Sequence, residues 1–210
     1  MKNPTLLTAL LSAATIAGYV SYRLTIGTDE PTSAMTTRAQ DAGHEQHADE
    51  MPALADSLPD VVLDDMAGAP TAIASFAGKP LLINFWATWC QPCLREIPLL
   101  KAFHNEHADI DVIGIAVDHL EPVLAYAEDM QFNYPTLVGQ SDGMAAMAAF
   151  QNDSGAMPFS VYVAGDGAIL GKHAGELHEE HLENFLAAVA ALQSGEVDRQ
   201  GARDMLAGLR

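Results

Sequence analysis

Two cysteines, Cys90 and Cys93, are the residues of this 210-residue chain best suited to chemistry, and only Gln91 and Pro92 separate them. Cysteines so close together cannot link distant parts of a chain, as the disulfides of small secreted domains do. A structural zinc site needs further Cys or His ligands, and the chain has no second cysteine pair. The spacing therefore indicates either a redox-active pair or an inert local disulfide.

A buried strand followed by a helix would position this pair for redox chemistry. Residues 81–86 (LLINFW) form a nearly continuous apolar run of the kind that a central strand shows, and a helical pattern follows from about residue 90 to residue 107. Cys90 would lie at the helix start, where free backbone N–H groups and the helix dipole stabilise a thiolate. Cys93 would lie one turn further along the same face. We therefore expect Cys90 to attack a partner's disulfide and the more shielded Cys93 to resolve the mixed disulfide.

Strand and helix patterns alternate along the rest of residues 58–193, which predicts an α/β domain with a sheet covered by helices. Further strands are expected at 112–117 and 135–138, and a hairpin of 160–164 with 168–173 around the turn Gly165-Asp166-Gly167. Helices are expected at 121–130, 142–150 and 178–192. The C-terminal tail, residues 194–210, shows no pattern that assigns it a role.

The amino end is expected to be a membrane anchor, residues 1–23. Thr5 to Tyr22 is uncharged and long enough to span a bilayer, although a cleaved signal peptide is the alternative. We favour the anchor because the apolar run continues past Ala17, where cleavage would leave a short apolar core. Lys2 would hold the start in the cytoplasm, so the domain is expected on the periplasmic side of a bacterial inner membrane.

Residues 24–57 are expected to form a flexible linker, because they are rich in Thr, Ala, Asp, Glu and His and have few periodic apolar positions. Its histidines and carboxylates are possible weak transition-metal ligands, but nothing preorganises them, so a solvated linker is the favoured interpretation. The chain carries 28 acidic and 10 basic residues, a formal net charge of -18. That charge opposes phosphate binding, so nucleic acid is not expected as a partner.

Residues 84–93 (NFWATWCQPC) match in type and order the active-site segment of the thioredoxin superfamily. Over about residues 58–192 the chain resembles the TlpA/ResA/DsbE branch of membrane-anchored, extracytoplasmic thioredoxin-like proteins. The resemblance implies a thioredoxin-like fold, with a central mixed sheet flanked by helices and a helix-strand insertion between about residues 117 and 143. It also implies that the cysteine pair is redox-active.

The resemblance further implies roles for two other residues. Glu96 stands where this branch places an acidic residue, and it would take or return a proton during exchange. Without the resemblance, an exposed carboxylate paired with Arg95 or Lys101 would be the expectation. Pro158 stands where the superfamily has a cis-proline facing the cysteines, with the backbone of Met157 offered to an extended substrate. An ordinary trans proline opening an edge strand is the alternative.

The function implied is a thiol-disulfide oxidoreductase that reduces protein disulfides with electrons from a membrane thiol-disulfide donor. Trp89, Gln91 and Pro92 would join the Met157–Pro158 segment in contacting the substrate. Apocytochrome c and copper-site assembly proteins are the implied substrates, although the Gly-Ala-Pro-Glu-Thr pattern of the cytochrome c maturation subgroup is absent. An oxidant remains an alternative because direction depends on reduction potential, and so does a copper-handling module that uses the dithiol. No prosthetic group and no metal are expected.

Overall fold

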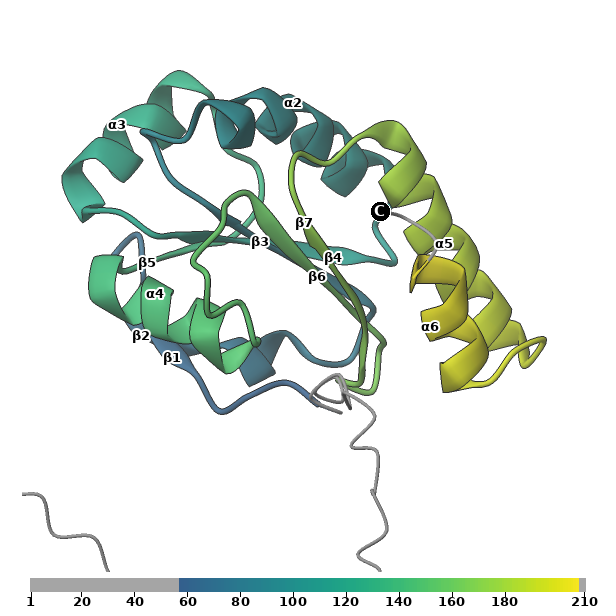
Figure 1. Ribbon diagram of the computed structural model, residues 1–210. Coiled ribbons are helices and arrows are strands. Elements are labelled where there is room, and N and C mark those ends of the chain that lie inside the picture. Colours follow the sequence, from purple (N-terminus) through teal and green to yellow (C-terminus); the bar gives the residue numbers. More distant parts are fainter. Residues whose placement is uncertain (1–56, 208–210) are drawn as a thin grey trace, which may run out of the picture. The chain divides into compact units, whose positions relative to one another are not determined.

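The computed structural model describes residues 57–207, which form a seven-stranded mixed sheet with helices on both faces (Figure 1). The strands are β1 (Val62–Asp65), β2 (Pro70–Ala72), β3 (Leu81–Trp86), β4 (Asp111–Ala116), β5 (Thr136–Val138), β6 (Phe159–Val163) and β7 (Ile169–Ala174). The helices are the 3-10 helix η2 (Ile73–Phe76) and α2 (Gln91–Glu106), α3 (Leu120–Asp129), α4 (Gln140–Ala149), α5 (Glu179–Ser194) and α6 (Arg199–Ala207).

The sheet has the order β2-β1-β5-β4-β3-β6-β7, with β3 in the interior between β4 and β6. β3 and β4 are parallel, as are β4 and β5, whereas β6 runs antiparallel to both β3 and β7. All six residues of β3 are buried, because helices cover both faces of the sheet at this strand. The apolar run predicted as a central strand is therefore confirmed.

Alternate side chains of β3 pack into the core on opposite faces of the sheet. Leu81, Ile83 and Phe85 pack with residues of α4 and η2. Leu82 lies on the opposite face, in a cluster with residues of α2, α5 and α6. Trp86 belongs to that same face and packs with the cysteines and with residues of α3. Asn84 alternates with Leu82 and Trp86 along β3, so its side chain lies on the same face of the sheet, under α2.

The predicted helices, strands and hairpin are present within a few residues of their expected bounds. The expected helix-strand insertion is also present, with α3 and β5 following β4. The sequence patterns did not predict β1, the edge strand β2, the short helix η2, or α6, which packs on β7 and buries Ala202 and Leu206.

The expected anchor and nearly all of the expected linker lie outside the described residues. Within residues 57–207, no helix is long and apolar enough to cross a membrane.

Candidate active site

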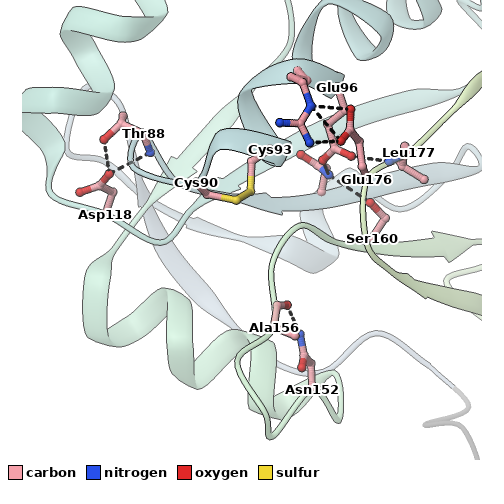
Figure 2. The surroundings of a disulfide bond; sticks show 12 residues. Thr88, Cys90, Cys93, Glu96, Asp118, Asn152, Ala156, Ser160, Glu176 and Leu177 are labelled. Atoms are coloured by element: carbon pink, nitrogen blue, oxygen red, sulfur yellow. Dashed lines mark hydrogen bonds and ion pairs between the residues drawn. A yellow bond between two sulfur atoms is a disulfide. The ribbon is translucent and has the colours of Figure 1, made fainter.

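The cysteine pair lies where β3 gives way to α2, and its sulfurs form a disulfide (Figure 2). β3 ends at Trp86, and the Cys90 N–H then donates to the Ala87 carbonyl oxygen at 3.1 Å, which closes a tight turn. Cys90 is the N-cap residue of α2, and Cys93 lies in its first turn. Cys90 is 6% exposed and Cys93 is fully buried, which is the order of exposure expected from the sequence.

The start of α2 suits a thiolate. The Cys90 side chain makes no capping hydrogen bond, so no such bond ties it to the first N–H groups of the helix. Pro92 is tolerated in this first turn because its missing N–H would have no partner within the helix. A negative charge on the Cys90 sulfur would lie at the positive end of the helix dipole.

Glu96 lies three residues beyond Cys93 on the buried face of α2 and is only 1% exposed. Its Oε1 accepts a hydrogen bond of 2.7 Å from Asn84 Nδ2, and its Oε2 accepts one of 2.6 Å from the Leu177 N–H. Burial raises the pKa of Glu96 to about 7, although the hydrogen bonds from Leu177 and Asn84 oppose the rise. A carboxyl group with this pKa can exchange a proton near neutral pH.

The alternative in which Glu96 is an exposed carboxylate paired with a neighbouring cation is wrong. Arg95 is exposed and forms an ion pair with Glu176, with its Nε 3.1 Å and 3.0 Å from the two carboxylate oxygens. Lys101 donates a hydrogen bond to the Met130 carbonyl oxygen. The hydrogen bond from Arg95 lowers the pKa of Glu176, which therefore stays ionised beside the loop that carries Leu177.

Asn84 connects Glu96 to the neighbouring strand. The Asn84 side chain is fully buried on β3, and its Nδ2 also lies 3.0 Å from Ser160 Oγ on β6. Asn84 and Ser160 are register partners in the antiparallel pair, which puts both side chains on the face under α2. Two buried tyrosines, Tyr134 and Tyr162, have pKa values raised by burial and then by the charge of Glu96, so both phenols stay protonated. Sequence reasoning missed Ser160 and Leu177.

The loop before β6 adds a second wall to the site. The Met157–Pro158 peptide bond is cis, which confirms the expected backbone form and excludes the trans alternative. Met157 packs against the cluster that contains both cysteines. Asn152 Nδ2 donates to the Ala156 carbonyl oxygen at 2.9 Å and so ties this loop to the end of α4 (Figure 2).

The residues next to Cys90 in the chain, which form the rim of the pair, are more exposed than the cysteines themselves. Trp89 is 64% exposed, Gln91 is exposed and Pro92 is half-buried. Just before them, both the backbone N–H and the hydroxyl of Thr88 donate to the buried carboxylate of Asp118, which sequence reasoning also missed. Its only sequence signal is an acidic residue following the apolar run 112–117.

Within residues 57–207, no group of three or more His, Cys, Asp or Glu side chains is arranged to hold a metal ion. Near the start of α5, the rings of His173 and His178 each lie tilted against the ring of His181, with centroids 4.1 Å and 5.7 Å away.

The sequence of this chain is similar to those of known thiol-disulfide oxidoreductases. The family model described as Redoxin matches residues 53–189. The thiol-disulfide oxidoreductase ResA of Bacillus cereus is 26% identical over 134 residues, which cover 62% of this chain and 75% of that protein.

Two solved structures are also similar. A secreted Mycobacterium tuberculosis disulfide oxidoreductase, described as homologous to Escherichia coli DsbE, has a TM-score of 0.54 and 22% identity, over 61% of this chain and 96% of that one. A thiol:disulfide interchange protein of the thioredoxin family from Chlorobium tepidum has a TM-score of 0.56 and 25% identity, over 64% and 95%. The expected thioredoxin-like fold is thereby confirmed.

Proposed function

This chain belongs to the Redoxin family and is a thiol-disulfide oxidoreductase, and we propose that it reduces disulfides of specific partner proteins outside the cytoplasm. The observation that carries this proposal is the Cys90–Cys93 pair at the start of α2, with the carboxyl group of Glu96 buried one turn beyond Cys93. The direction of electron transfer rests on the resemblance to the TlpA/ResA/DsbE branch.

The exchange proceeds through two displacements at sulfur. In the reduced protein, the Cys90 thiolate attacks one sulfur of the partner's disulfide, so a Cys90–partner bond forms and the partner's other sulfur leaves as a thiolate. Cys93 then attacks Cys90, which restores the Cys90–Cys93 disulfide and releases the partner's second thiolate. Two electrons pass to the partner. A thiol-disulfide donor reverses these steps and reduces the pair again.

Glu96 is the proposed acid/base for the second displacement. Cys93 is fully buried, so its thiol needs an internal acceptor for its proton before it can attack. Glu96 is three residues away on the same helix face, and its pKa of about 7 lets it accept that proton near neutral pH and return it when the pair is reduced.

The substrate is proposed to lie across the exposed rim of the pair. Trp89 precedes Cys90 in the turn, and Gln91 and Pro92 follow it at the start of α2. On the other side, Met157 packs against the cluster that contains both cysteines and is followed by the cis-proline Pro158. The backbone of Met157, before the cis-proline, would pair with an extended segment of the partner that carries the disulfide. Backbone pairing accepts many sequences, so the exposed side chains would supply the selectivity.

The setting proposed for this reaction is the periplasmic side of the inner membrane, with residues 1–23 as the anchor and a membrane thiol-disulfide protein as electron donor. The partners proposed are assembly proteins of the cytochrome c or copper-site type, which need their cysteines reduced. An anchored reductase would act close to its donor, which raises the rate of their encounter.

The reduction potential of the full-length chain in detergent, equilibrated in defined thiol buffers, tests the direction. We expect a value below roughly −200 mV, on the reducing side of protein disulfide isomerase. A value near that of a strong oxidant, about −120 mV, would contradict the proposal and make the chain a disulfide donor.

A trapping experiment tests the site assignment. Cys93→Ser leaves Cys90 free to attack but removes the resolving thiol, so mixed disulfides with partner proteins should accumulate and be released by a reductant. Cys90→Ser is the matched control and should trap no partner. Equal trapping by both variants would contradict the assignment of Cys90 as nucleophile.

A further inference from the structure

Asp118 is a buried carboxylate that no part of the exchange reaction described above uses. It follows the end of β4 by two residues and is 6% exposed. Its Oδ2 accepts from the Thr88 N–H at 3.0 Å and from Thr88 Oγ1 at 2.5 Å, and its Oδ1 accepts from the His119 N–H at 2.8 Å. Figure 2 shows Asp118 and Thr88 facing each other, on the opposite side of the disulfide from Glu96.

A carboxylate is costly to bury unless hydrogen-bond donors replace its water. Here every donor that satisfies Asp118 comes from one of two loops, the turn before Cys90 and the start of α3. Hydrogen bonds to an ionised acceptor are among the stronger ones in proteins, so this carboxylate holds the two loops in a fixed relation. The Val117 N–H also donates to the Trp86 carbonyl oxygen at 2.8 Å, so the hydrogen bonding between β3 and β4 extends to the residue just before Asp118.

The turn that carries Trp89 is fixed at both ends, because Ala87 and Cys90 are buried in the same core cluster and the Cys90 N–H donates to the Ala87 carbonyl oxygen. Trp89 is 64% exposed, so packing does not fix its side chain in the free protein. Between the two ends of the turn, Asp118 holds Thr88 with two hydrogen bonds, so it contributes to the direction in which Trp89 and the Cys90 sulfur point.

We propose that Asp118 is a positioning residue for the redox centre, which acts through Thr88 to hold the Cys90 sulfur at the start of α2 and Trp89 toward the partner. This inference rests on the proposed function, because it assigns a role in the same exchange reaction. In this role Asp118 acts on the reaction only through Thr88. Its effect is to keep the attacking thiolate aligned with the N–H groups of α2 that stabilise it.

The side chain of Thr88 allows a test that changes no charge. Thr88→Val removes the hydroxyl donor and keeps a branched side chain, whereas Thr88→Ser keeps the donor. Asp118→Asn weakens the acceptor but also removes a negative charge near Cys90, and that change alone would favour the thiolate. The Thr88 pair therefore decides the question, because neither substitution changes a charge.

The readouts are the pH dependence of Cys90 alkylation by iodoacetamide in the reduced full-length protein, and kcat and KM for dithiol-driven reduction of a peptide disulfide. For Thr88→Val we expect the midpoint of alkylation to rise by about half a pH unit or more, and kcat/KM to fall about tenfold. Thr88→Ser, which keeps the hydroxyl donor, should match the wild type. Thr88→Ala supplies the same comparison if valine prevents folding.

A merely structural role for Asp118 would lower the melting temperature of Thr88→Val without moving the alkylation midpoint or kcat/KM of the folded protein. That result would overturn the inference and leave the proposed function standing. Failure of the proposed function has a different signature, because the wild-type protein itself would then show no Cys90-dependent turnover.

Discussion

The residue with the most unusual environment is Glu96, whose pKa is set by opposing effects. Burial raises it, while the hydrogen bonds from Leu177 and Asn84 favour the ionised form and pull it down. The result, about 7, lies far above the 4.5 of an exposed glutamate. Because a proton acceptor works best when its pKa is near the working pH, the two donors are as important to the chemistry as the burial is.

Removing the Asn84 donor should therefore raise the pKa of Glu96 further. Asn84→Val deletes the hydrogen bond to Oε1 and makes the site less polar, and both changes disfavour the carboxylate. A hydrogen bond to a charged group contributes about 1.5 to 3 kcal/mol, so we expect a rise of about one unit or more. The measurement is a carbon-13 NMR titration of the Glu96 carboxyl group in the oxidised protein.

Ser160→Ala is the control for this substitution, because Ser160 contacts Asn84 but makes no hydrogen bond to Glu96. It should shift the titration of Glu96 by much less than Asn84→Val does. If the two variants gave equal shifts, the direct hydrogen bond from Asn84 would not be what lowers the pKa.

How far a site residue could be predicted depended on how local its contacts are. The Cys90–Cys93 pair is a short local pattern and forms the disulfide, whereas the cis bond at Pro158 was expected only from the family resemblance, because a trans proline would suit the same residues. The burial of Glu96 followed only from the family resemblance, since its position on a helix would also suit an exposed carboxylate. Ser160 and Leu177 could not be predicted, because they meet Asn84 and Glu96 only through strand register and a loop about 80 residues away in the chain.

Secondary-structure elements with a strong local sequence pattern could likewise be predicted, and those that depend on distant contacts could not. β3, β4 and the β6–β7 hairpin have strong patterns of their own, whereas β2 has three residues and lies at the sheet edge. α6 has only nine residues and buries only Ala202 and Leu206, so a sequence pattern has just two core positions by which to recognise it. α6 packs closely on β7 at Gly171, which has no side chain. A Cβ at this position would lie 3.2 Å from Leu206 Cβ, so the glycine leaves room for Leu206.

If α6 is part of the packed domain, shortening Leu206 should destabilise the whole fold. Leu206 is 5% exposed in the cluster that contains Phe185 and Leu182, and a buried Leu→Ala change costs about 2 to 5 kcal/mol. We expect a loss in this range for Leu206→Ala, measured by urea unfolding of the oxidised protein. Met205→Ala is the matched control, because its 39% exposed side chain should cost about 0.5 kcal/mol or less. Equal, small losses in both variants would mean that α6 is not docked in solution.

At the scale of the whole molecule, burial of Glu96 has a consequence for stability. Its carboxyl group has a pKa of about 7 in the folded protein and about 4.5 when exposed, so the folded state binds its proton more tightly than the unfolded state does. The free energy of unfolding that this group contributes is therefore highest below about pH 4.5. It is lost as the pH rises to about 7 and above.

Other groups work in the opposite direction. The pKa values of Asp166 and Glu176 are lowered in the folded state, the first mainly by the Ala168 N–H and the second by Arg95. Asp166 is exposed and Glu176 is half-buried, and both contribute stability that is lost as the pH falls. The pH dependence of the wild type alone is therefore a sum of opposing effects, and only a comparison with a variant isolates Glu96.

Glu96→Gln provides that comparison. Gln does not titrate, so the wild type minus variant difference in unfolding free energy should fall by about 3 kcal/mol between about pH 4.5 and pH 7. Gln also presents an amide N–H₂ to one of the two donors, Asn84 or Leu177, and that clash adds an offset that does not depend on pH. The slope of the difference, and not its size at one pH, is thus the quantity that reports on Glu96.

Urea unfolding of the oxidised proteins at steps across this range measures the slope, since the disulfide keeps both cysteines from titrating. Parallel curves for wild type and Glu96→Gln would mean that the Glu96 carboxyl group has the same pKa folded and unfolded. Such a group would already be ionised at neutral pH, and it could not hold a proton for Cys93. A falling difference, by contrast, would show that folding raises the pKa of Glu96 well above 4.5, so that its carboxyl group can both accept a proton from Cys93 and return it near neutral pH.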